Sequence, residues 1–246
     1  MKKTLLLAAT AVMVGSAAFA QTIAPTSITT LSTNTFVEGW VLGGDAGLNM
    51  SQASFANGAA GGDNSIAFDA SLNYSANLRR GKHLWTNRLE LAYGLNNTQS
   101  NRGVRKTNDK IYFATNYGYM IANNLYMGAL ASFQTQFAEG YTYNSDGSSD
   151  YISNFMSPGY LNAGLGLIWT YRPWLKFTFS PATYRATFVN SDVLSLQGKY
   201  GVTPGEHMLN QFGADIMAEL NTPLWQNIRL YSRLELYSNY LKNPQN

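Results

Sequence analysis

The chain of 246 residues contains no cysteine. Disulfide bonds, thiolate metal sites, a catalytic thiol and a lipid-modified cysteine are therefore excluded, whatever compartment the chain reaches. Histidine is almost as scarce, because the sequence has two of them. A metal site built from several histidines is excluded as well. We expect neither a bound metal nor a cofactor.

Charged residues make up 13% of the chain, about half the share that is usual in soluble domains. The formal net charge is +3, and the lysines and arginines are scattered, which argues against a nucleic-acid partner. No stretch of about 20 apolar residues follows the first part of the chain, so we expect no membrane-spanning helix. Aromatic residues, in contrast, reach 13%.

The first residues have the three parts of a secretory signal peptide. Two lysines precede an apolar run over 5–14, and Ala18-Phe19-Ala20 gives the small-x-small pattern of a cleavage site. A buried N-terminal helix is the alternative. The predicted organisation is a signal peptide over 1–20, a flexible segment over 21–37 and a barrel domain over 38–246.

Most of the chain after Glu38 alternates between apolar and polar residues with a period of two, which is typical of a strand with one apolar and one polar face. Most of the alternating segments have ten or more residues, and a tilted transmembrane strand needs about 9–11. The predicted strands are 40–50, 66–78, 85–95, 110–119, 125–137, 160–171, 175–180, 208–220 and 227–240.

The seventh of these strands is short, and it can continue only if the phase of the alternation changes. Phe177 and Phe179 occupy odd positions, whereas Tyr184 and Phe188 occupy even ones. A bulge at Pro181 accounts for the change. Two separate strands are the alternative.

The links between the predicted strands alternate in length. The long links are 56–62, 96–107, 138–158 and 190–205, and the short ones are 79–82, 121–123, 172–173 and 222–226. Outer-membrane barrels join their strands by short periplasmic turns and longer external loops. This alternation of long and short links predicts an all-β fold, a transmembrane antiparallel up-and-down β-barrel of about nine or ten strands.

An odd number of strands leaves the first and last strands parallel, whereas bacterial single-chain barrels almost always close with an even number. The residues 241–246 are typical of the start of another loop. We therefore expect a barrel that lacks its closing strand.

Several short phrases resemble a family of uncharacterised outer-membrane β-barrel proteins of Gram-negative bacteria, known as a domain of unknown function. The phrases are Asn57 with Gly61-Gly62-Asp63-Asn64-Ser65, Lys106-Thr107-Asn108-Asp109-Lys110-Ile111, Thr135-Gln136-Phe137 with Gly140-Tyr141, Ile152-Ser153-Asn154-Phe155 with Ser157-Pro158, and Ser238-Asn239-Tyr240 with Asn243-Pro244. The family pattern has Trp where this chain has Gly58. The resemblance implies an outer-membrane barrel with a further strand, and it implies no activity, ligand or catalytic residue.

The polar faces of the predicted strands carry charges of both signs, which we expect to face the lumen. They are Asp45, Asp69, Arg88, Glu90, Lys176, Asp215, Glu219, Arg229, Arg233 and Glu235. A selective pore favours one sign. In a narrow barrel, mixed charges are expected to pair and to plug the lumen.

Large aromatic residues beside the short links predict a girdle at the periplasmic membrane interface. They are Trp85, Trp169, Tyr171, Trp174 and Trp225. Packing in the core of a soluble protein is the alternative.

Enzymatic chemistry has one candidate residue. His83 falls in a predicted short turn, whereas His207 lies beside Glu206 at the loop end of a strand. His207 could act as the base of an outer-membrane hydrolase, although the sequence assigns no nucleophile to it. A polar residue at the rim of the barrel is the alternative, and we do not expect an enzyme.

Three functional hypotheses follow. The first is a non-enzymatic outer-membrane barrel, structural or binding a surface glycan or protein partner through the loops 138–158 and 190–205. The second is a narrow passive channel for small solutes, and the third is the hydrolase with His207. Membrane lipid and the barrel-assembly machinery are the expected partners in each case.

Overall fold

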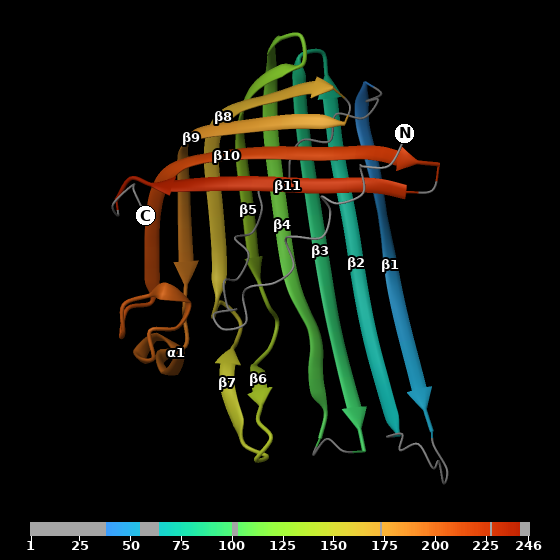
Figure 1. Cartoon of the computed structure of the whole chain (residues 1–246), viewed down its shortest axis with the longest axis vertical. Helices are drawn as coiled ribbons and strands as arrows, with labels where there is room; N and C mark the ends of the chain where they lie inside the picture. Colours follow the sequence, from blue (N-terminus) through green and yellow to red (C-terminus); the bar gives the residue numbers. More distant parts are fainter. Residues whose placement is uncertain (1–37, 55–63, 100–102, 173, 227, 242–246) are drawn as a thin grey trace, which may run out of the picture.

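The computed structural model describes residues 38–54, 64–99, 103–172, 174–226 and 228–241. The predicted signal peptide and flexible segment fall outside these ranges. Nine strands form one antiparallel sheet, ordered as they follow one another along the chain (Figure 1). They are β1 (Gly39–Ala53), β2 (Ser65–Arg80), β3 (His83–Thr98), β4 (Arg105–Ala122), β5 (Leu125–Thr135), β8 (Gly159–Arg172), β9 (Leu175–Phe188), β10 (Met208–Trp225) and β11 (Ile228–Asn239).

Each of the nine predicted strands corresponds to one strand of this sheet, which confirms the prediction of an all-β, antiparallel up-and-down fold. Most of the observed strands extend beyond the predicted ones, whereas β5 and β11 are slightly shorter than predicted. β4, for example, begins at Arg105 instead of residue 110 and is paired with β3 along its polar start. Backbone hydrogen bonds continue the ladder there without any need for apolar alternation.

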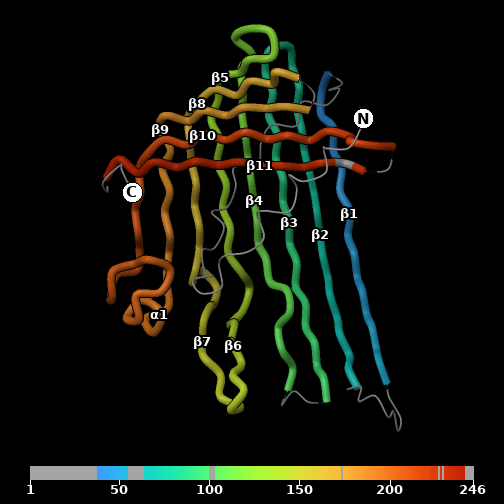
Figure 2. The backbone as a smooth tube through the Cα atoms, in the orientation of Figure 1, coloured from blue at the N-terminus to red at the C-terminus, as the bar shows by residue number. Residues whose placement is uncertain are grey.

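The sheet bends through its second half. In Figures 1 and 2, β1 to β5 run along the long axis, whereas the later strands turn and run across it. The bend coincides with a bulge in β9. Between the pairs Gly213–Thr183 and Asp215–Ser180, β10 has one residue and β9 has two, and β8 shifts its register against β9 at the same level. The bulge predicted at Pro181 is confirmed, and the alternative of two separate strands is wrong.

β1 and β11 are the edges of the sheet, and no ladder joins them in the described part of the chain. The sheet therefore curls without closing. Because every neighbouring pair is antiparallel, β1 and β11 point in the same direction along the sheet.

The two faces of the sheet have opposite character. In β4, Tyr112 and Asn116 are buried on one face, which we call the inner face, whereas Phe113 and Tyr117 are exposed on the other, the outer face. The same alternation leaves large apolar side chains exposed along the other strands. A water-soluble sheet normally shows the reverse arrangement, with its polar face in contact with water.

A hydrophobic cluster occupies the inner face towards the short turns. It contains Leu84, Tyr126, Leu130, Ile168 and Met217, which come from β3, β5, β8 and β10. β3 and β10 are not neighbours in the sheet. The bend therefore brings the second half of the sheet across the inner face of the first half.

Two of the expected long loops contain regular structure, which corrects the prediction for them. The link after β5 forms a hairpin of β6 (Gly140–Tyr143) and β7 (Ser149–Ser153). The link after β9 contains a short helix, α1 (Asp192–Leu196), and a 3-10 turn, η1 (Lys199–Gly201). Among the described residues, no helix has the length and apolar character to cross a membrane.

We predict that Gly213→Ala destabilises the bend. An added Cβ at this position would collide with the backbone carbonyl oxygen of Ser238 in β11. The expected loss of unfolding free energy is about 1–3 kcal/mol, measured by urea-induced unfolding followed by circular dichroism. Gly43→Ala is the matched control, because its Cβ would make an ordinary 3.5 Å contact with Ser75 Oγ. Equal midpoints for the two variants would show that the close approach at Gly213 does not matter.

Candidate functional site at the loop end of the sheet

The predicted inward charges of the last strands form one connected network on the inner face. Arg185 forms ion pairs with Asp215 and with Glu235, the second at 2.7 Å. Arg233 contacts Glu235 at 3.1 Å and Glu219 at 3.7 Å. Positive and negative groups alternate through the network, so each buried charge has an opposite charge beside it.

Arg185 is the centre of this network, and the sequence interpretation missed it. Its guanidinium also lies over the ring of Tyr237, 3.9 Å from the ring centroid. The sequence does contain a signal for Arg185. The bulge at Pro181 shifts the alternation of side chains in β9 by one residue, so the odd-numbered side chains point inward after it. Position 185 therefore lies on the inner face, which the alternation before Pro181 does not predict.

Most of the remaining charges of the predicted set lie away from this network. Glu90 forms ion pairs with Arg88 and with Lys110, a lysine that was not in the predicted set. Asp45 accepts a 2.9 Å hydrogen bond from Asn73 near the β1 edge.

Asp69 accepts a 3.3 Å hydrogen bond from Asn108. Lys176 lies opposite Glu219 in the register of β9 and β10. The side chain of Arg229 is outside what the structure describes.

The predicted aromatic residues all lie at the short-turn end of the sheet, where they are exposed. Trp169 packs against Tyr171 and Phe177, with centroid distances of 5.2 and 5.9 Å. Trp85 packs against Trp40 at 5.6 Å. Trp40 was not predicted as part of this group. With it, all five tryptophans of the chain lie at one end of the strands.

His207 sits at the start of β10 with both ring nitrogens in contact with other groups. Its Nδ1 is 2.7 Å from the carbonyl oxygen of Val189, to which it donates, and its Nε2 is 3.4 Å from the exposed carboxylate of Asp192. The buried hydroxyl of Ser195 donates to the carbonyl oxygen of Glu206. No group of three or more residues able to hold a metal occurs in the described part of the chain.

The residues 189–207 fold into a small unit, which we call the cap. Val189, Leu194 and Val202 are buried together, and Tyr151 of the hairpin packs against them. The hydroxyl of Tyr200 donates to the backbone carbonyl of Ile152, and burial raises the pKa of Tyr200 to about 12. The cap and the hairpin are therefore held together at the loop end of the sheet.

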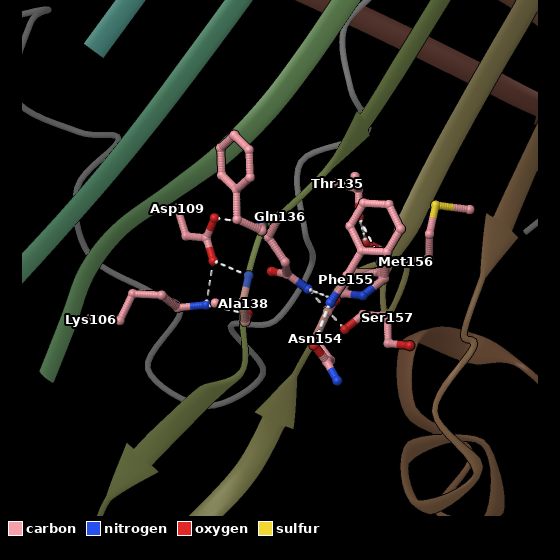
Figure 3. Close-up of polar contacts among 11 residues, drawn as sticks. Lys106, Asp109, Thr135, Gln136, Ala138, Asn154, Phe155, Met156 and Ser157 are labelled. Atoms are coloured by element: carbon pink, nitrogen blue, oxygen red, sulfur yellow. Dashed lines mark hydrogen bonds and ion pairs between the residues drawn. The ribbon is translucent and has the colours of Figure 1, made fainter. Parts of the chain in front are cut away.

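Asp109 connects β4 to the chain that leaves β5 (Figure 3). Its carboxylate accepts hydrogen bonds from the backbone amides of Phe137 and Ala138 at 2.7 and 3.0 Å and pairs with Lys106 at 2.6 Å. The Asp109 side chain is 4% exposed. One buried carboxylate therefore satisfies two amides and one ammonium group.

Gln136 and Thr135 hold the returning chain on the other side of the hairpin. The Gln136 amide donates to the carbonyl oxygens of Asn154 and Ser157 at 2.6 and 2.9 Å (Figure 3). Thr135 accepts from the amide of Met156 at 2.9 Å. Both ends of the hairpin are thus fixed to the ends of β4 and β5.

A pocket of about 420 Å³ lies between the loop ends of β3 and β4 and the hairpin. Tyr93, Tyr141 and Tyr143 contribute to its wall, together with Lys106 and Glu139. Tyr141 donates a 2.6 Å hydrogen bond to Glu139, and this bond raises the pKa of the Tyr141 phenol. We take this pocket as the candidate functional site.

Residues 50–141 match the model of the family described as "Protein of unknown function (DUF3078)". The match confirms the resemblance to an uncharacterised family for this segment. It includes Lys106, Asp109 and Gln136 and ends within β6, before Asn154 and Ser157. No curated protein and no solved structure matches the chain.

We predict that Arg185→Met strongly destabilises the sheet. The substitution leaves the carboxylates of Asp215 and Glu235 without their shared cation, which is expected to cost about 3–5 kcal/mol of unfolding free energy. Arg80→Met, at an exposed position beside a short turn, should change it by less than about 0.5 kcal/mol. Adding Asp215→Leu to Arg185→Met should recover part of the loss in the same urea titration. Additive losses in the double variant would contradict a pairing role.

We predict that Asp109→Ala loosens the hairpin. Two backbone amides and Lys106 lose their buried acceptor, and the expected cost is about 3 kcal/mol. Limited proteolysis should then cut within 138–157 at least tenfold faster than in the unchanged protein. Asp146→Ala, in the exposed turn of the hairpin, is the control. Similar cleavage rates in both variants would rule out the anchoring role of Asp109.

Proposed function

We propose that this protein is a non-enzymatic β-barrel-type protein of a bacterial outer membrane, which presents its folded loop end to a binding partner outside the cell. The observation that carries the proposal is the outer face of the sheet. On that face Leu48, Met50, Leu165 and Leu236 are 70%, 72%, 61% and 56% exposed. Contact with lipid accounts for such a surface, because soluble monomers rarely expose large contiguous apolar areas.

The distribution of aromatic residues supports the same proposal. Tryptophans are enriched where a protein crosses the boundary between lipid and water, and here they gather at the short-turn end of the sheet. Short turns belong to the periplasmic side of outer-membrane barrels. The proposal therefore places the hairpin and the cap on the external side and assigns residues 1–20 to export as a signal peptide.

The inner face favours a plugged interior over the alternative of a passive channel. The cluster around Leu130 and Ile168 joins strands across the inner face. The charges around Arg185 are paired with one another. A water-filled pore needs an open polar interior, so the packing supports a structural or binding role. The hydrolase alternative keeps His207 as its sole candidate base.

Quenching by brominated lipid tests the proposal. A variant that keeps Trp85 and has phenylalanine at the other tryptophan positions should lose fluorescence in vesicles of brominated phosphatidylcholine. Bromine near the headgroup should quench more strongly than bromine near the chain end, because Trp85 is exposed on the outer face beside a short turn.

The control moves the tryptophan to the inner face. Tyr126→Trp in a chain without other tryptophans places the indole in the buried cluster at the same end of the sheet. This variant should show little quenching in either lipid. Equal quenching of the two variants, or none for Trp85, would overturn the membrane proposal.

A further inference from the structure

A second pocket adjoins the candidate site. It has a volume of about 490 Å³ and lies between Arg105 and the turn of the hairpin that contains Asp146. Val104 and Tyr143 line both pockets. The two pockets therefore adjoin at Val104 and Tyr143, between the start of β4 and the β6–β7 hairpin, and we call them together the groove.

We propose that this groove binds a neutral oligosaccharide. The inference rests on the proposed function, because that function directs the loop end away from the cell. A groove of two adjoining pockets fits an extended ligand of linked rings better than a single compact molecule.

Aromatic side chains provide the surface against which sugar rings can stack. Tyr93, Tyr141 and Tyr143 line the first pocket, and Tyr143 continues into the second. A tyrosine ring offers an apolar face to the carbon-bound hydrogens of a sugar and a hydroxyl at its edge. The guanidinium of Arg105 covers one face of Tyr143, 4.1 Å from the ring centroid, and so holds this ring in place.

Polar groups in the groove supply hydrogen bonds for sugar hydroxyls. Asn108, Glu139 and Asp146 line the groove and combine an amide with two carboxylates. An amide both donates and accepts, whereas a carboxylate accepts. Hydroxyl groups, which are donors and acceptors at once, match this mixture.

The charges of the groove disfavour a phosphate or sulfate group. Lys106 is engaged by Asp109 at 2.6 Å and by the carbonyl oxygen of Ala138 at 2.7 Å. The hydrogen bonds from Ser148 lower the pKa of Asp146, so this carboxylate is ionised at neutral pH. Recognition of phosphate normally uses a cluster of available arginines and lysines. The other cation of the groove, Arg105, lies over the ring of Tyr143, and Glu139 and Asp146 add carboxylates to the lining.

The hairpin wall of the groove is held in one position before any ligand binds. Tyr141 contacts Tyr151 at a centroid distance of 5.7 Å, and Tyr151 packs on the cap. Gln136 and Asp109 fix the two ends of the hairpin. Binding therefore needs little reordering of the loop end, which reduces its entropic cost.

The experiment is isothermal titration calorimetry of the full protein in detergent micelles. The probes are maltohexaose, cellohexaose and chitohexaose as neutral ligands, and a heparin hexasaccharide as an anionic one. We expect saturable binding of at least one neutral probe and none of the heparin probe. Tyr143→Ala should weaken the binding about tenfold, because it removes the central stacking surface. Tyr143→Phe should keep it within about twofold, because the ring remains.

Tyr171→Ala is the matched control, since Tyr171 is an exposed tyrosine at the opposite end of the sheet, and it should leave the affinity unchanged. Binding of none of the neutral probes, binding of heparin alone, or equal affinities of the Tyr143→Ala and Tyr171→Ala variants would overturn the inference. The quenching of Trp85 by brominated lipid in the same preparation separates this failure from a failure of the membrane proposal. If the quenching persists while sugar binding is absent, the groove assignment alone is wrong.

Discussion

The structure depends on one constraint, which is the placement of apolar side chains on the outside of a sheet whose inside is polar and packed. Successive side chains of a strand point to opposite faces, so this division repeats along the strands of the nine-stranded sheet and shifts by one residue at the bulge in β9. The inner face then has to satisfy its own polar groups. Ion pairs around Arg185 and Glu90 pair its charged groups, and the small cluster around Leu130 packs its apolar ones. The bend in the second half of the sheet brings Met217 of β10 into the same cluster as Leu84 of β3, a strand that is not its neighbour.

The sequence was sufficient for the parts of the fold that repeat with a regular period. All nine strands of the sheet, the bulge at Pro181 and the tryptophan-rich end follow from local patterns. The β6–β7 hairpin was missed, because the residues between Tyr143 and Tyr151 are small and polar and resemble an ordinary loop. A hairpin held by Asp109 and Gln136 is stabilised by contacts with other segments, which a local pattern does not contain.

The candidate site could be predicted less completely for a related reason. Most of the predicted inward charges lie on the inner face, but the groove involves different residues. Its walls come from β3, β4 and the hairpin, which meet only after the chain has folded. Individual residues such as Tyr143 carry no local signal of a shared pocket. The phrases around Lys106 and Gln136 that resemble the family did point to this region, and the structure brings them together in one hydrogen-bonded network.

The ion pairs of Arg185 also constrain how the strands align during assembly. A slip of β11 by one residue against β10 would turn Glu235 and Arg233 to the outer face and bring their neighbours inward. A slip that places Leu236 opposite Asp215 would bring an apolar side chain beside this carboxylate, and Arg185 would lose Glu235, one of its two carboxylates. A misaligned β11 would therefore place charged side chains on the apolar outer face and lose an ion pair on the inner face. The ion pairs of Arg185 therefore favour the observed register between β10 and β11, the last two strands of the sheet.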